Sequence, residues 1–343
     1  MKLSIIVPVY NMAAEDKLKH CLDSLIAQTV TDYEIIGVDD CSTDDSYEIL
    51  KSYEEKYPDR FRAIHSEVNK HQGGAKNIGI RAAKGDWIGF IDADDWITPD
   101  MYEQLIDKAE ETGATCVGCD YSLVNDYTFE VGQVVANSCA EQTGVLEPEQ
   151  KKAIILNCGS LVVKIYKRSI ILENDLFFPE DIFYEDNAMG NSYLLTNERY
   201  EYIPKPLYYY YQHAESTVHT VDVKRCQDRM VAGRIMIDEA KRLGFYEDYR
   251  AELEFRFAEL FYVNTLFTYM PCVKPTRLSF VRALSKEMAE YFPDFQSNPY
   301  YQERIHAEEK KLIAMAQRST LYFFVYYKLL WAYRNFRKRL SHG

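Results

Sequence analysis

The sequence feature that most constrains the fold of this chain is an apolar run that ends in three acids within four residues. It occupies residues 87–96 and reads Trp-Ile-Gly-Phe-Ile-Asp-Ala-Asp-Asp-Trp. The apolar part predicts a strand that is buried on both faces, as in a parallel sheet covered by helices. Because an unpaired buried charge is costly, the carboxylates should lie where the strand emerges at its C-terminal end.

The acids of this run have two interpretations. Ligands bind at the carboxyl edge of open α/β sheets, and the pair Asp92-x-Asp94 suits a hard divalent cation such as Mg²⁺ or Mn²⁺. The alternative is an acidic turn that caps the helix beginning near Pro99. The run alone does not decide between them.

Strand-like and helix-like segments alternate four times before residue 115. The expected strands are 3–9, 34–38, 61–65 and 87–92, and the expected helices are 16–28, 44–57, 74–83 and 99–112. This alternation predicts an α/β fold with a mostly parallel, doubly wound sheet and helices on both faces.

Two other strand ends also carry polar chemistry. Tyr10 and Asn11 follow the first strand, and Asp39 and Asp40 follow the second. Because parallel strands end at the same edge, these residues should meet the acids after the fourth strand. The acids can accept hydrogen bonds from a base or a ribose, and Tyr10 offers an aromatic face. The alternative for residues 42–44 is a helix N-cap, and we expect one of them to have that role as well.

A glycine pair precedes the third helix. Gly73 and Gly74 allow close approach of the backbone, and Lys76 can face a phosphate from there. The alternative is a flexible loop followed by a solvated lysine.

These segments, in this order and spacing, resemble the family 2 glycosyltransferases, which are inverting enzymes of the GT-A fold. The resemblance rests on residues 4–11, 38–44, 74–79 and 90–95. It is specific over residues 1–115 and looser to about residue 220. It implies a uridine held by Pro8, Tyr10, Asn11 and Asp40, a ribose near Asp92, and Mn²⁺ or Mg²⁺ bound by Asp94. The usual pattern has Arg where this chain has Lys76, which keeps the charge but loses bidentate geometry.

Two Glu-Asp pairs compete for the role of catalytic base. In the resembling family a Phe-Pro-Glu piece precedes the functional pair, which favours Asp186 with Glu185 over Glu180-Asp181. Acids that merely interact with a helix dipole are the alternative. The resemblance also allows His213 to complete the metal site, although a lone histidine is more often structural.

Composition limits the partners and the compartment. With 40 Lys and Arg against 53 Asp and Glu, the net charge is −13, which argues against a nucleic-acid partner. Met1-Lys2 leads directly into a strand pattern, and no apolar run is long enough to span a membrane, which predicts a cytoplasmic protein. Cys116 and Cys119 could bind zinc or take part in redox chemistry, but buried thiols explain the pair more simply.

The chain after residue 221 is expected to be helical, so we divide it into a GT-A domain at 1–220 and a helical region at 221–343. The expected helices are 222–243, 246–269, 275–291, 300–317 and 319–340. The last one is basic and amphipathic and too short to span a bilayer. It should lie at the inner face of a membrane or pack on its neighbours or in a homo-oligomer.

The residues together predict an inverting, metal-dependent glycosyltransferase that moves a sugar from a UDP-sugar to a hydroxyl of a glycan or lipid-linked acceptor. A nucleotide diphosphate leaves without a proton donor when a cation stabilises its charge, so a single base is enough. Nucleotidyl transfer would require a Gly-rich basic loop after the first strand, where the chain has Tyr10-Asn11-Met12. A noncatalytic scaffold that binds a partner through the helical tail is the other alternative.

Overall fold

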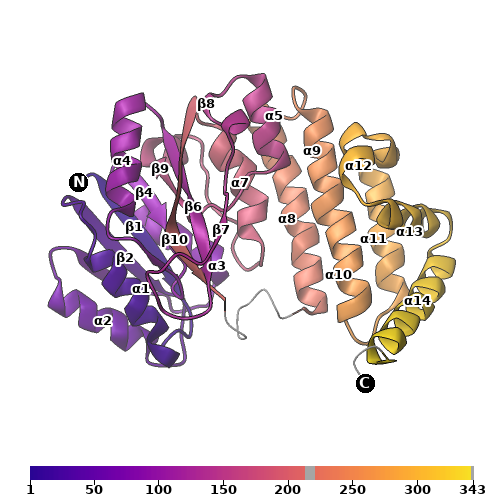
Figure 1. Cartoon of the computed structure of the whole chain (residues 1–343), viewed down its shortest axis with the longest axis horizontal. Helices are drawn as coiled ribbons and strands as arrows, with labels where there is room; N and C mark the ends of the chain where they lie inside the picture. Colours follow the sequence, from indigo (N-terminus) through magenta and orange to yellow (C-terminus); the bar gives the residue numbers. More distant parts are fainter. Residues whose placement is uncertain (213–220, 341–343) are drawn as a thin grey trace. The chain divides into compact units, whose positions relative to one another are not determined.

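The chain folds into two compact units, residues 1–216 and 217–343. The structure is a computed structural model that describes residues 1–212 and 221–340 (Figure 1). The first unit combines one sheet with helices, and the second is built from helices.

Among the described residues of the first unit, ten strands form one sheet in the order β3-β2-β1-β4-β9-β6-β10-β5, with β7 beside β6 and β8 beside β10. The strands are β1 (Leu3–Val9), β2 (Tyr33–Asp39), β3 (Phe61–His65), β4 (Trp87–Phe90), β5 (Trp96–Ile97), β6 (Cys116–Val124), β7 (Gln133–Val135), β8 (Gly144–Val145), β9 (Lys164–Lys167) and β10 (Arg199–Tyr211). Strands β1 to β4 pair in parallel, as the alternation predicts. Strand β9 lies antiparallel between β4 and β6, so the sheet as a whole is mixed.

Helices cover both faces of this sheet. They are α1 (Lys17–Ile26), α2 (Ser46–Lys56), α3 (His71–Ala82), α4 (Met101–Thr112), α5 (Pro148–Leu156), α6 (Arg168–Glu173) and α7 (Glu185–Leu195). Phe90 of β4 packs against Tyr193 of α7, whereas a Cβ on the adjacent Gly89 would lie 2.7 Å from the ring of Tyr102 in α4. Because adjacent residues of a strand point to opposite faces, α7 and α4 lie on opposite faces of the sheet.

The segment between residues 126 and 212 completes the sheet. Residues 126–141 contain the short strand β7 and a 3₁₀ turn at Ala140–Gln142. Strand β10 pairs in parallel with β6 along most of its length, and two short strands lie antiparallel on its other flank, β8 near Arg199 and Tyr200 and β5 near Tyr208 and Tyr209. The sequence could not show this, because the partners come from distant segments.

Cys116 and Cys119 are buried free thiols in β6. Burial raises the pKa of Cys116 to about 12 and raises the pKa of Cys119 as well. A thiol of this kind is a small packing side chain, because the reactive form is the thiolate. The structure therefore supports the packing interpretation of this Cys-x-x-Cys pair.

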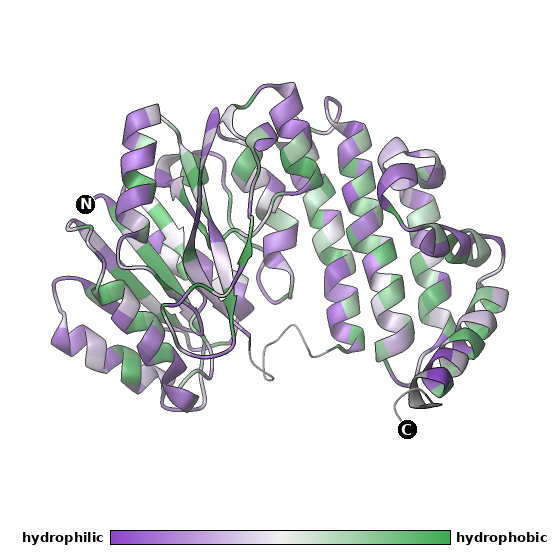
Figure 2. Cartoon of the chain, in the orientation of Figure 1, coloured by the Kyte–Doolittle hydropathy of each residue, from purple (hydrophilic) through white to green (hydrophobic). Residues whose placement is uncertain are grey.

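The second unit consists of helices α8 (Val223–Arg242), α9 (Arg250–Phe257), α10 (Thr265–Cys272), α11 (Leu278–Tyr291), α12 (Pro299–Arg304), α13 (Ala307–Arg318) and α14 (Thr320–Leu340). A π-helical stretch, Ala258–Asn264, joins α9 to α10. The expected helix at 300–317 is two helices, which separate at Ile305 and His306. Apolar residues line the central strands of the first unit and much of α10 and α11, as the green segments of Figure 2 show.

No helix within residues 1–212 and 221–340 combines the length and the apolar content needed to cross a bilayer.

Lys164 is an unusual core residue because its charged side chain is fully buried in β9. Its Nζ donates hydrogen bonds to the carbonyls of Ser160 at 2.5 Å and Cys158 at 3.2 Å. Burial disfavours the charged form and lowers the pKa of Lys164 to about 8. Below that pH the folded state carries the full penalty of a buried cation.

The stability of the protein should therefore rise with pH between about 8 and 10.5 relative to a Lys164→Met variant. In this range the unfolded lysine keeps a proton that the folded one has lost, and the shift corresponds to about 3 kcal/mol. Urea unfolding of both proteins at several pH values measures the difference. Lys167→Met, on the same strand, is the control. A difference that stays constant with pH would contradict the assignment.

Candidate active site

The carboxyl ends of β1, β2 and β4 meet at one edge of the sheet. Asp39 pairs with Val9, and Phe90 pairs with Ile6, so the residues after these strands emerge side by side. The structure thus brings together three of the clusters that the sequence singled out: Tyr10-Asn11, Asp39-Asp40 and Asp92 to Asp95.

Backbone and side-chain hydrogen bonds tie the loop after β1 to the loop after β2. Asn11, with a left-handed φ of 52°, accepts from the backbone N–H of Thr43 at 2.8 Å and donates its own N–H to Ser42 Oγ at 3.0 Å. Asp44 accepts from the N–H of Ala13 at 2.9 Å. Asp44 Oδ1 also accepts from the N–H of Ser46, the first residue of α2, at 3.0 Å, although Asp45 directly before the helix makes no side-chain cap.

The predicted nucleotide-binding residues of these loops differ in exposure. Pro8 is buried within β1, opposite Val38 of β2. Tyr10 is 47% exposed, so its ring is open to a ligand. Pro8 therefore shapes the strand, while the side chain of Tyr10 is accessible at the edge.

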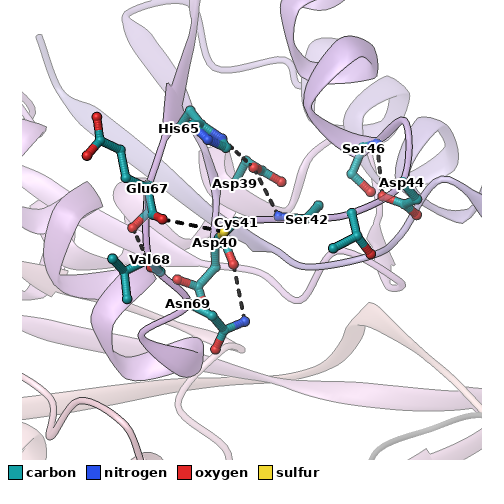
Figure 3. A network of polar contacts seen from close by, with 12 residues as sticks. Asp39, Asp40, Cys41, Ser42, Asp44, Ser46, His65, Glu67, Val68 and Asn69 are labelled. Atoms are coloured by element: carbon teal, nitrogen blue, oxygen red, sulfur yellow. Dashed lines mark hydrogen bonds and ion pairs between the residues drawn. The ribbon is translucent and has the colours of Figure 1, made fainter.

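Asp40 is buried at the centre of a polar network (Figure 3). Its Oδ1 accepts from the backbone N–H of Lys70 at 2.8 Å, and its carbonyl accepts from Asn69 Nδ2 at 3.2 Å. Burial raises the pKa of the Asp40 carboxyl, while the hydrogen bond from Lys70 opposes that effect. This contact fixes the loop before α3 against the end of β2.

Asp39 and His65 form a pair that the sequence analysis did not single out. Asp39 is fully buried, and its Oδ2 lies 2.7 Å from His65 Nδ1 and 3.3 Å from the N–H of Ser42. Its Oδ1 is buried and has no hydrogen-bond partner among the described atoms. The two residues are register partners in β2 and β3, so a histidine at the end of the third strand was the available signal.

The three acids after β4 divide into one inward and two partly exposed side chains. Asp95 is buried and accepts from Tyr208 Oη at 2.5 Å and from the N–H of Tyr211 at 2.8 Å. Asp92 and Asp94 are partly exposed, and Asp92 accepts from Gln72 Nε2 at the start of α3. Burial and the neighbouring acids raise the pKa of Asp92, although Lys76 opposes this.

Lys76 is buried in α3, and its Nζ lies 2.8 Å from Glu185 Oε1. Burial acts to lower the pKa of Lys76, but the charges of Glu185 and Asp92 outweigh it and the pKa is raised. The same Nζ lies 5.2 Å from the ring centre of Phe178. The expected solvated or phosphate-facing lysine therefore has a carboxylate of the protein as its nearest partner, and its contact with a diphosphate stays a prediction.

Glu185 and Asp186 occupy the first turn of α7, after Tyr184 with a left-handed φ of 68°. Glu185 is buried in its pair with Lys76, whereas Asp186 is exposed. Asp186 Oδ1 accepts from the N–H and the side-chain amide of Asn187 at 2.7 and 2.8 Å. The two neighbouring acids therefore differ in surroundings: one holds the helix start in place, and the other faces outward.

The competing pair, Glu180-Asp181, contacts α3 and the residue directly before it. Glu180 lies 2.9 Å from Lys70 Nζ and accepts from Asn77 Nδ2 at 3.3 Å. A Cβ on Gly73 would lie 2.2 Å from the carbonyl oxygen of Pro179, so only glycine lets this segment pack there. The glycine pair is expected to allow close approach of the backbone. At Gly73 the structure shows such an approach, and the partner is another segment of the same chain.

The carboxylates at this edge fit a divalent cation in their chemistry. Asp92 and Asp94 present oxygen ligands next to further negative charge from Glu185 and Asp186, which a cation would neutralise. No group of three or more His, Cys, Asp or Glu close enough to bind a metal is found among residues 1–212 and 221–340. His213, predicted as a further ligand, lies outside the described residues.

Removal of the Lys76 cation should destabilise the first unit strongly. Lys76→Met leaves Glu185 as an unpaired buried charge, which costs about 3–5 kcal/mol. Lys70→Met removes a half-exposed partner of Glu180 and should cost only about 0–1 kcal/mol. Urea unfolding measures both. Equal losses in the two variants would show that the buried pair has no special role.

The comparisons with known proteins agree with this arrangement. The sequence model of the family described as Glycosyl transferase family 2 matches residues 4–171. YibD of Escherichia coli K12, described as an uncharacterized glycosyltransferase, is 34% identical over 219 residues, which are 63% of this chain and 62% of YibD. EpsH of Bacillus subtilis 168, described as a putative glycosyltransferase, is 34% identical over 263 residues, covering 74% of this chain and 73% of EpsH.

A solved structure extends the likeness to the whole chain. The crystal structure of TarS 1–349 from S. aureus in complex with UDP-GlcNAc has a TM-score of 0.69 at 22% identity and covers 98% of this chain and 92% of that one. The likeness shows that the two chains share a fold, which confirms the GT-A fold followed by helices. The match to EpsH, the family model and the shared fold together establish that the chain belongs to glycosyl transferase family 2.

Proposed function

We propose that the protein is an inverting, metal-dependent glycosyltransferase that transfers a sugar from a UDP-sugar to a hydroxyl of a glycan or lipid-linked acceptor at the inner face of a membrane. The observation that carries the proposal is the division of Glu185 and Asp186. A buried carboxylate fixes the helix start, and the adjacent exposed one lies close enough to Asp92 for its charge to help raise the pKa of that acid.

The nucleotide would bind at the ends of β1 and β2. Tyr10 is exposed there and can lie against a base, and the buried Asp40 can accept from a base N–H. Asn11 and the loop hydrogen bonds around Thr43 keep this surface in shape. TarS, which shares the fold, has been crystallised with UDP-GlcNAc, and this supports a uridine nucleotide as donor.

Asp92 and Asp94 would hold the cation beside the diphosphate. A bound Mn²⁺ or Mg²⁺ supplies charge stabilisation for the departing nucleotide. Both acids are partly exposed in this turn, whereas Asp95 is buried and turns inward to Tyr208. The hydrogen bond from Gln72 further orients Asp92.

Asp186 would act as the base. It would accept the proton of the acceptor hydroxyl as that oxygen attacks the anomeric carbon opposite the departing diphosphate. A single displacement inverts the configuration at that carbon. Glu185 acts through position alone, because its carboxylate is already paired with Lys76. The helix dipole of α7 helps Asp186 remain ionised.

The first test concerns the cation. UDP at about 100 times its Kd should stabilise the protein by about 2.7 kcal/mol, and only when Mn²⁺ or Mg²⁺ is present. Asp94→Asn should remove this metal-dependent part of the rise in Tm. Asp107→Asn, which changes an exposed acid of α4, is the matched control. A rise with UDP that is equal without metal would refute the role of Asp94.

The second test concerns the base. Asp186→Asn should leave UDP binding near the wild-type level but reduce sugar transfer by about 10²–10⁴-fold, since only the proton-transfer step loses its acceptor. Asp181→Asn, which alters an exposed acid five residues earlier, should change transfer little. Both variants are assayed for UDP release with a panel of UDP-sugars and acceptors. If Asp181→Asn is inactive and Asp186→Asn is active, the assignment is wrong.

A further inference from the structure

Helix α14 packs against the other helices of the second unit through one narrow face. Phe323 is fully buried and Tyr327 is 5% exposed, and they are the only buried side chains among those described on this helix. Both rings face the helices that α14 packs against, α11 and α13 among them, and Tyr327 lies 6.2 Å from the ring of Phe267. Most of the helix surface is therefore exposed.

The exposed surface of α14 carries a continuous apolar stripe, which we call the tail stripe. Its seven side chains are between 40% and 66% exposed: Leu321, Tyr322, Val325, Tyr326, Leu329, Tyr333 and Phe336. The spacing of three or four residues places them on one side of the helix over about 22 Å. A patch of this size on a protein surface is typical of an interaction site.

Cations flank the tail stripe. At about 100° per residue, Lys328 borders one side of the stripe and Arg337 borders the other, whereas Arg334 lies further round the helix, toward the packed face. All three are exposed, and Arg334 also pairs with Glu308 of α13. Residues 310–343 contain eight Lys or Arg and no Asp or Glu, whereas the whole chain has a net charge of −13. This end of the chain is thus strongly basic in an acidic protein.

We propose that the tail stripe inserts into the interfacial layer of an anionic membrane, with the flanking cations at the level of the lipid phosphates. An apolar stripe bordered by Lys and Arg is the pattern of a helix that lies in the plane of a bilayer. Charge selects the lipid over a second copy of the chain, because two copies joined through this face would bring their cations together, whereas anionic lipids complement them.

This surface deepens the proposed function, since an enzyme with a lipid-linked acceptor must work next to the bilayer. Only the biological purpose of the membrane contact rests on the proposed function. The contact itself follows from the exposed side chains of α14, and its test uses no substrate.

The test is sedimentation of the full-length protein with vesicles of phosphatidylcholine, with or without phosphatidylglycerol. Binding should require phosphatidylglycerol and weaken as salt is raised. Leu329→Glu places a charge within the stripe and should lower vesicle affinity at least about tenfold. Asn335→Glu adds the same charge at an exposed site outside the stripe and should have a much smaller effect.

A second variant removes charge at exposed positions of the helix. The double variant Lys328→Gln with Arg337→Gln should lower affinity about 25-fold, at about fivefold for each cation, and leave the Tm unchanged. Equal binding to both vesicle types would overturn the proposal, as would wild-type binding by Leu329→Glu. So would light scattering that shows a dimer dissociated by Leu329→Glu. UDP binding, measured in parallel, should be unaffected by these variants, so a failure here is separate from a failure of the proposed enzyme.

Discussion

The buried ion pair between Lys76 and Glu185 is the interaction on which the rest of the candidate site depends. It joins α3 to α7 across 109 residues of sequence. Both side chains are withdrawn from water, so each needs the other to offset its desolvation. Gly73 makes the approach feasible, because it lets the segment that leads into α7 pack directly on α3. The contact also fixes the backbone at Asp186, which is the next residue along the chain.

The three acids after β4 lie in one short turn but have different surroundings. Both carboxylate oxygens of Asp95 accept hydrogen bonds from β10, and these bonds hold the turn in place. Asp92 and Asp94 remain at the surface of the same turn, where their mutual repulsion favours a cation. None of these acids caps α4, because its N-cap is Asp100 and makes no side-chain cap, and metal binding by Asp92 and Asp94 stays a prediction.

Much of the first unit could be predicted because its signals are local. Strands β1 to β4 and helices α1 to α4 follow from apolar runs and helical spacing, and the structure places them within a few residues of the expected bounds. The errors arise where distant segments decide the outcome. Nothing near residues 164–167 indicates that β9 enters the sheet antiparallel between β4 and β6. In the same way, the composition of α3 does not reveal that Lys76 faces Glu185, or that His65 meets Asp39. The π-helical stretch at Ala258–Asn264 likewise has no local sequence signal.

The link between Asp95 and Tyr208 has a consequence for the order in which the protein is made. Tyr208 follows Asp95 by 113 residues, so at about 5–20 residues per second the ribosome needs several seconds to supply it. Strands β1 to β4 can pair during that interval, because all of them precede the acid turn. The turn itself stays solvated until β10 has been synthesised and has joined β6. The nascent chain therefore carries every strand-end motif of the site before it can hold the acid turn in its final form.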